Sequence, residues 1–316
     1  MARLKRGIAG APRALAVAVA SGALLAAAPC GTLPQPAQAG PALLIVATSS
    51  IVADWAREVG GERVEVFSLV PPGGDPHSFQ PGARAIARVA EADLILATGL
   101  GLEASWMDDL VRNAAADRSR VVRLGDSVGP LVFAGTGGQA VPDPHFWLDP
   151  LRVGLAVDEI ATRLSALDPE GGTSYRENAA VYRYRLGVLH AWVQEQVATI
   201  PPDRRILVTG HDSFRYFAAL YGYRVVGSVT PGVTTEREAS AEELARLVDA
   251  IREHGAPAVF VEASMDDRLA RSVADDTGAR VVGSLLGGSL GPPGSDADTY
   301  IGMMRADVRT IVEALK

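Results

Sequence analysis

Short, strongly apolar runs rich in β-branched residues recur along the chain, separated by segments with helical periodicity. Near-continuous apolar runs that alternate with helices are typical of parallel strands buried on both faces of a sheet. The pattern predicts an α/β protein with two lobes, each built on a mainly parallel four-stranded sheet flanked by helices. The runs lie at residues 43–48, 64–70, 93–98 and 120–124, and then at 205–210, 224–229, 258–263 and 280–285.

The interval between the two sets of strands has a helical pattern. Ser174 and Glu177 have the spacing of a capping box. A single apolar face sustained over about 27 residues, or roughly 40 Å, predicts one rigid α-helix that joins the lobes. We therefore expect an N-terminal lobe at 40–168, a linker helix at 169–201 and a C-terminal lobe at 202–316. The apolar positions of this face are 175, 179, 182, 186, 189, 193, 197 and 200.

The first 39 residues have the features of an export signal. Basic residues come before the apolar run at 14–28, and Ala37-Gln38-Ala39 fits the small-x-small pattern of a cleavage site. We expect a signal peptide at 1–39 and a periplasmic or cell-surface protein. The apolar run is short for a membrane helix. Lipid anchoring at Cys30 is the alternative, although Pro29 directly before it fits a lipoprotein signal poorly.

Composition narrows the class of partner. The chain is 48% hydrophobic and 21% charged, which is ordinary for a globular protein, and its formal net charge is −7. No basic cluster occurs after residue 39, so we expect no nucleic-acid partner. Cys30 is the single cysteine, so no internal disulfide is expected.

Three histidines lie past the carboxyl ends of predicted strands, where open α/β sheets bind ligands. His77 lies in PPGGDPHSFQP after the second strand, and His145 lies in DPHFWLDP after the fourth. His211 lies in TGHDSF after the first strand of the second lobe. Neutral imidazole is the common nitrogen ligand for zinc and other late first-row metals. The pattern predicts a metal site in the cleft, with two ligands from the first lobe and one from the second.

Five motifs carry a resemblance to a known family: GGDPHSFQP, DPHFWLDP, TGHDSFRYFAALYGY, FVEAS and GPPGSDADTYIGMMRADVRTIVEAL. From about residue 42 to its end, the chain resembles the solute-binding proteins of zinc and manganese ABC importers, the adhesin-type or cluster A-I family. The resemblance implies two lobes bridged by a rigid helix and metal ligands at His77, His145 and His211. We therefore expect a monomer that delivers the metal to an ABC permease in the cytoplasmic membrane, with a metallochaperone as a further candidate partner.

The prolines around His145 would then hold a metal ligand in place. Asp143 and Asp149, each just before a proline, are candidates to orient the imidazole through its second nitrogen.

The family pattern breaks at Gly288, where related proteins usually carry an aspartate ligand. Glycine cannot coordinate through a side chain, so three outcomes stay open. A water completes the site, a nearby carboxylate (Asp296, Asp298 or Glu236) moves in, or metal binds weakly or not at all. Three imidazoles without a carboxylate favour Zn²⁺ over Mn²⁺ as cargo. The His-rich loop of many zinc-specific relatives is absent from residues 133–143.

Two other classes of function remain as alternatives. In the first, the same fold binds an organic or chelated ligand or acts as a surface adhesin without metal. A zinc hydrolase with three histidine ligands is less favoured, because no HExxH motif supplies a general base and Glu262 and Asp212 fit structural hydrogen bonding better. We therefore expect a binding protein rather than an enzyme.

Overall fold

The structure, a computed structural model, describes residues 42–114, 116–134 and 139–316. It contains the two four-stranded parallel sheets that the apolar runs predicted, with strand orders β2-β1-β3-β4 and β10-β9-β7-β8. The strands are β1 (Leu43–Ala47), β2 (Val64–Ser68), β3 (Leu94–Ala97), β4 (Val121–Arg123), β7 (Ile206–His211), β8 (Arg224–Thr230), β9 (Ala258–Glu262) and β10 (Arg280–Leu285).

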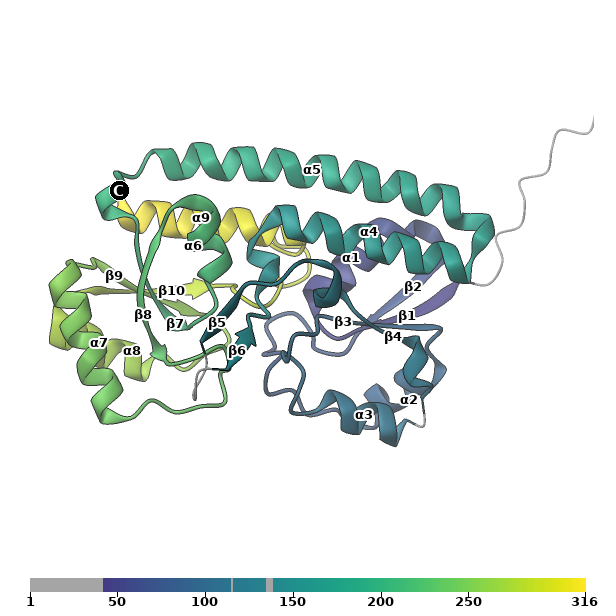
Figure 1. Cartoon of the computed structure of the whole chain (residues 1–316), viewed down its shortest axis with the longest axis horizontal. Coiled ribbons are helices and arrows are strands. Elements are labelled where there is room, and N and C mark those ends of the chain that lie inside the picture. The colour runs from purple at the N-terminus through teal and green to yellow at the C-terminus, as the bar shows by residue number, and fades with distance from the viewer. Residues whose placement is uncertain (1–41, 115, 135–138) are drawn as a thin grey trace, which may run out of the picture. The chain divides into compact units, whose positions relative to one another are not determined.

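The two sheets share one topology, in which the first strand (β1 or β7) lies between the second and the third. Helices therefore cover both faces of each sheet (Figure 1). The helices are α1 (Ser50–Gly60), α2 (Ala83–Glu91), α3 (Met107–Asn113), α4 (Pro150–Leu167), α5 (Gly172–Ala198), α6 (Arg215–Tyr221), α7 (Ala241–His254), α8 (Arg268–Thr277) and α9 (Tyr300–Leu315).

Alternation along the buried strands divides the apolar side chains among three cores. Ile45 and Ala47 of β1 pack with α1, whereas Val46 packs on the opposite face with α2 and α3. In the second sheet, alternate residues of β7 and β9 likewise pack against α7 and α8. The remaining faces of both sheets share one core with α1, α4, α5, α6 and α9. The two lobes are therefore joined by a common hydrophobic core as well as by the chain.

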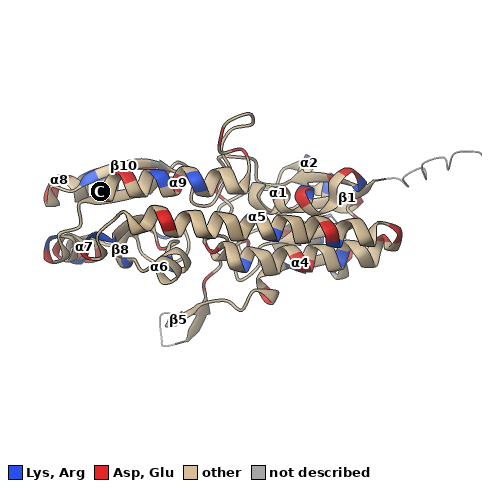
Figure 2. Ribbon diagram, turned by 90° about the horizontal axis from the view of Figure 1, so that it is seen from above, with Lys and Arg blue, Asp and Glu red and all other residues tan. Residues whose placement is uncertain are grey.

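The long helix α5 spans 27 residues and runs along both lobes, as the apolar stripe predicted (Figure 1). Helices α4 and α9 lie beside it, one over each lobe (Figure 2). The predicted capping box is wrong, because α5 begins at Gly172 and Ser174 lies inside its first turn. No side chain caps this helix, whose N-cap residue is Gly171. Asp168 instead caps the short 3-10 turn Pro169–Gly171 that leads directly into α5, where its carboxylate accepts a hydrogen bond from Gly171 N.

A small antiparallel hairpin, β5 (Val132–Ala134) with β6 (Ala140–Pro142), lies where the sequence indicated only a loop. Its three-residue strands are too short to produce a detectable alternation. The predicted signal peptide and Cys30 lie outside the described residues. Within residues 42–114, 116–134 and 139–316, no helix combines the length and the apolar character needed to cross a membrane.

The buried Asp54 of α1 ties the first lobe to α9. Its Oδ2 accepts a hydrogen bond from Tyr300 N at 3.0 Å, at the first residue of α9, and lies 3.4 Å from the Tyr182 hydroxyl of α5. Burial raises the pKa of Asp54 to about 6 from its ordinary value of 3.8. A carboxyl whose pKa is raised on folding stabilises the fold at low pH, and this contribution is lost as the pH rises through 6.

We expect the unfolding free energy of Asp54→Asn, relative to that of the wild type, to rise by about 2–3 kcal/mol as the pH increases from about 4 to about 8, because the ionised carboxylate is penalised only in the folded protein. Denaturant unfolding at several pH values measures this difference. Asp249→Asn, on the exposed side of α7, controls for the loss of one charge. A difference that does not change with pH would contradict the assignment.

Candidate metal centre

The structure brings the three predicted histidines together between the lobes. His77 lies in the loop after β2, and His145 lies just before the 3-10 turn Phe146–Leu148 that leads into α4. His211 is the last residue of β7, so it belongs to a strand end rather than to the loop beyond it. Their side chains each offer a nitrogen within 4.8 Å of the other two, and all three residues are buried.

The ring nitrogens are spaced as ligands of one small cation. His145 Nε2 lies 3.3 Å from His77 Nε2 and 3.1 Å from His211 Nε2. Two nitrogens bound tetrahedrally at bonds of about 2.0–2.1 Å lie about 3.3 Å apart. These two nitrogen–nitrogen distances are therefore close to the separation that one tetrahedrally coordinated ion of this size requires.

Burial keeps two of the imidazoles neutral. It lowers the pKa of His77 to about 3, with further lowering by the neighbouring His145 and His211. Burial likewise places the pKa of His145 well below its ordinary range. Burial also disfavours the charged form of His211, but the carboxylate of Glu262 outweighs it and raises the pKa of His211. His77 and His145 thus present lone pairs at neutral pH without having to lose a proton first.

Two buried carboxylates support the outer nitrogens of this cluster. Asp143 Oδ1 lies 2.8 Å from His145 Nδ1 and also accepts a hydrogen bond from His145 N at 2.9 Å. Glu262 Oε1 lies 3.0 Å from His211 Nδ1 and accepts a hydrogen bond from Ser213 Oγ. Asp143 thereby orients the His145 ring with Nε2 toward the other two histidines, and both carboxylates place negative charge beside the cluster.

Of the two aspartates predicted to orient His145, Asp143 does so and Asp149 does not. Asp149 is the N-cap of α4, where its carboxylate accepts hydrogen bonds from Leu151 N and Arg152 N. An aspartate just before a proline at a helix start is a typical cap, and here that role places the side chain away from the imidazole.

Two glycines make room for Glu262. A β-carbon on Gly210 would overlap Glu262 Oε2, and one on Gly287 would lie 2.6 Å from Glu262 Cγ. Gly287 also has a φ of +44°, a left-handed conformation that favours glycine. The carboxylate is therefore enclosed by backbone on two sides, at a spacing that only glycine permits.

The loop at 286–290 closes one side of the cluster. Asp307 of α9 accepts hydrogen bonds from Leu286 N and Gly287 N, and Trp147 Nε1 donates to Gly287 O at 2.6 Å. The atoms nearest to a β-carbon added at Gly288 would belong to Pro76 and Trp147, at 3.9 Å, which is ordinary van der Waals contact. Pro76 is next to His77 in the chain and Trp147 is two residues from His145, so position 288 lies beside the segments that carry these histidines and has space for a side chain.

None of the three carboxylates proposed as substitutes for the missing aspartate joins the described cluster. Glu236, Asp296 and Asp298 are exposed, and the group of convergent ligands contains the three histidines alone. Asp298 instead accepts a hydrogen bond from Gly294 N.

Residues that hold the backbone around His77 were not predicted. Ser105 Oγ donates to His77 O at 2.7 Å, and Trp106 Nε1 donates to Pro76 O at 2.9 Å. Asp75 Oδ1 accepts a hydrogen bond from His77 N at 2.9 Å. The Asp-Pro pair before His77 was a usable signal for Asp75, but no local pattern links Ser105 or Trp106 to a loop about 30 residues earlier.

Comparison with known proteins identifies the chain as a metal-binding protein of the substrate-binding class of ABC importers. Residues 45–314 match the family described as zinc-uptake complex component A, periplasmic (ZnuA), and the chain belongs to this family.

Named relatives span both metals. The chain is 31% identical over 290 residues, or 90% of this chain and 93% of the relative, to the manganese ABC transporter substrate-binding lipoprotein PsaA of Streptococcus pneumoniae. It superposes on the periplasmic zinc-binding protein TroA of Treponema pallidum with a TM-score of 0.78 and 29% identity, covering 87% of this chain and 99% of TroA. A manganese-bound periplasmic metal-binding protein from Candidatus Liberibacter asiaticus gives a TM-score of 0.77 at 25% identity, covering 87% of this chain and 100% of that protein.

The close packing of Glu262 against Gly210 predicts that Gly210→Ala lowers the free energy of unfolding by about 1–3 kcal/mol, the usual cost of overpacking a core. Denaturant unfolding measures this loss. Gly283→Ala in β10 of the same lobe is the matched control, since its added β-carbon would have no atom within 4 Å. Equal stabilities of the two variants would show that Glu262 is not confined as described.

Proposed function

We propose that this protein captures a divalent transition metal at His77, His145 and His211 and delivers it to an ABC permease. The observation that carries the proposal is the convergence of three buried imidazole nitrogens from two lobes, two of them 3.1 Å and 3.3 Å from the third. Asp143 and Glu262 have buried carboxylates, whose negative charge would balance the positive charge of a bound dication. This arrangement supports reversible binding of a cargo ion, and the family to which the chain belongs is one of transport proteins.

We propose zinc as the preferred cargo over manganese. Relatives are named for both metals, so we infer the metal preference from the ligands of this chain. All three convergent donors are nitrogens, and position 288 offers no carboxylate. Zinc binds imidazole well and accepts four-coordination, which three histidines and one water satisfy. Manganese prefers oxygen ligands and stands low in the Irving–Williams order.

Export, processing and partners complete the proposal. We propose that the mature chain begins at Gly40 and functions as a monomer outside the cytoplasmic membrane, with lobes at 40–168 and 202–316 joined by the linker at 169–201. Several relatives are named lipoproteins, so attachment through Cys30 remains the alternative to cleavage after Ala39. The partner is the membrane permease, and a metallochaperone is a further candidate partner.

The central test is His145→Ala. Because His145 contacts both other imidazoles, we expect its loss to weaken zinc binding at least tenfold, or about 1.4 kcal/mol. Titration calorimetry of the wild type and the variant measures the two Kd values. His254→Ala, at the end of α7 and away from the cluster, is the control. An unchanged Kd for His145→Ala would remove this residue from the metal site, and no binding of zinc or manganese by the wild type would overturn the proposed function.

A second test restores a carboxylate to the vacant position. We expect Gly288→Asp to raise manganese affinity more than zinc affinity, because it adds the oxygen donor that manganese prefers and the site has space for it. Calorimetric titrations with both metals measure the change. Gly288→Ala fills the same space without a donor and should leave the ratio of the two affinities unchanged. If Gly288→Asp behaves as Gly288→Ala does, position 288 does not face the ion.

A further inference from the structure

The two lobes meet on several sides of the histidine cluster, and most of these contacts are firmly buried. The buried hydroxyls of Ser50 and Ser289 lie 3.3 Å apart, and Leu290 N donates to Ser50 Oγ. Behind the cluster, the Tyr216 hydroxyl donates to Asp143 O and accepts from Leu131 N. These hydrogen bonds connect the lobes through groups that lie in or next to the core, so separating them requires exposing buried polar atoms.

On one side of the histidine cluster the contact between the lobes is of a different kind. There the loop that carries His77, residues 71–82, faces the segment 231–240 of the second lobe. Thr235 Oγ1 donates a hydrogen bond to Asp75 Oδ2 at 2.6 Å, and Asp75 Oδ1 accepts from His77 N. No other hydrogen bond joins these two segments in the part of the chain that the structure describes. A single side-chain bond, two residues from His77, thus connects the lobes here.

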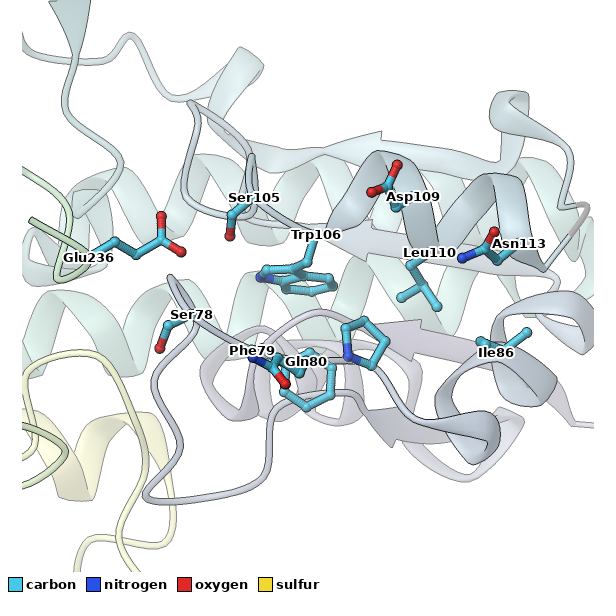
Figure 3. Close-up of a pocket in the computed structure, with 11 residues that line it drawn as sticks. Ser78, Phe79, Gln80, Ile86, Ser105, Trp106, Asp109, Leu110, Asn113 and Glu236 are labelled. Carbon is cyan, nitrogen blue, oxygen red and sulfur yellow. The ribbon is translucent and has the colours of Figure 1, made fainter.

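Two hollows are lined by residues of this contact or their near neighbours, so little packing reinforces it. A groove of about 340 Å³, with Trp106 at its centre, brings Ser78 of the loop opposite Glu236 of the segment at one end (Figure 3). A second hollow of about 580 Å³ includes Asp75 and Thr235 in its wall. Residues 236–238 and Ser240 are exposed and the rest of the segment is half-buried. Few buried apolar contacts and solvent on two sides characterise segments that open at low free-energy cost.

The histidines themselves are closed off from solvent, with exposed fractions of 5%, 1% and 5% for His77, His145 and His211. An ion therefore cannot exchange with solvent unless some covering segment moves. We propose that the segment 231–240 is the gate through which the metal enters and leaves, and that the hydrogen bond from Thr235 to Asp75 is its latch. This inference rests on the proposed function, and it adds the residue that sets how long the cargo is retained.

A latch lies on the path to the site without coordinating the ion, and this distinguishes it from a ligand. Weakening the latch speeds both entry and exit of the metal, and it leaves the ratio of the two rates almost unchanged. Loss of a ligand acts mainly on the exit rate and raises Kd. Thr235 is the residue to change, because Asp75 also holds His77 N and its replacement would disturb the imidazole directly.

The test is stopped-flow measurement of zinc association with the full-length protein and of zinc dissociation into excess chelator, together with the equilibrium Kd. We expect Thr235→Val to raise both rate constants about tenfold, the value of one hydrogen bond to a charged group, with Kd changed less than about threefold. Thr235→Ser keeps the hydroxyl and should retain wild-type rates. Thr234→Val removes a hydroxyl from the same segment that bonds only to Glu236 N, and it should also retain them.

Three results would overturn the gate. Unchanged rates in Thr235→Val would show that the ion passes elsewhere. Faster dissociation with an equally raised Kd would show that Thr235 merely supports His77. An equal effect of Thr234→Val would show that any disturbance of the segment suffices. In each case the wild type still binds zinc and the proposed function stands, whereas failure of the wild type to bind zinc or manganese would overturn both.

Discussion

The site depends on the mutual burial of three imidazoles, because this arrangement is unfavourable unless the surrounding protein compensates for it. Two of the nitrogens lie 3.1 Å and 3.3 Å from the third, so they cannot all carry protons facing one another, and burial disfavours their charged forms. The carboxylates of Asp143 and Glu262 fix the outer nitrogens, and Gly210 and Gly287 allow the second of these carboxylates to reach its place. The residues around the cluster therefore form a shell that holds the three imidazoles with their Nε2 atoms close together.

Most of the fold followed from the sequence because buried parallel strands and a long amphipathic helix leave periodic patterns over many residues. The eight strands and the apolar stripe of α5 are of this kind. The errors concern features that depend on a few residues. The expected capping box does not form, because the 3-10 turn Pro169–Gly171 leads directly into a helix that already begins at Gly172. The short β5–β6 hairpin had no pattern to detect.

The three site histidines could be chosen from the sequence because topology alone brings the carboxyl ends of parallel strands to one edge. Their supports were harder to identify. Asp143 and Asp149 occupy equivalent places before prolines, and only the direction of the chain at α4 makes one a partner of His145 and the other a helix cap. Ser105 and Trp106 hold the His77 loop from a distant part of the chain, which no local pattern can indicate.

The shared core has a consequence for how the molecule is assembled. Tyr300, at the start of the last helix, is fully buried among residues of the first lobe, where its ring packs edge-on against Trp55 and its hydroxyl donates to Trp147 O. A chain that emerges from its amino end first therefore cannot complete even its first lobe until nearly all 316 residues are available. Until the last helix has been synthesised, the N-terminal half of the chain keeps apolar surface exposed. In this state it can be bound by chaperones that prevent aggregation and can be cleaved by proteases.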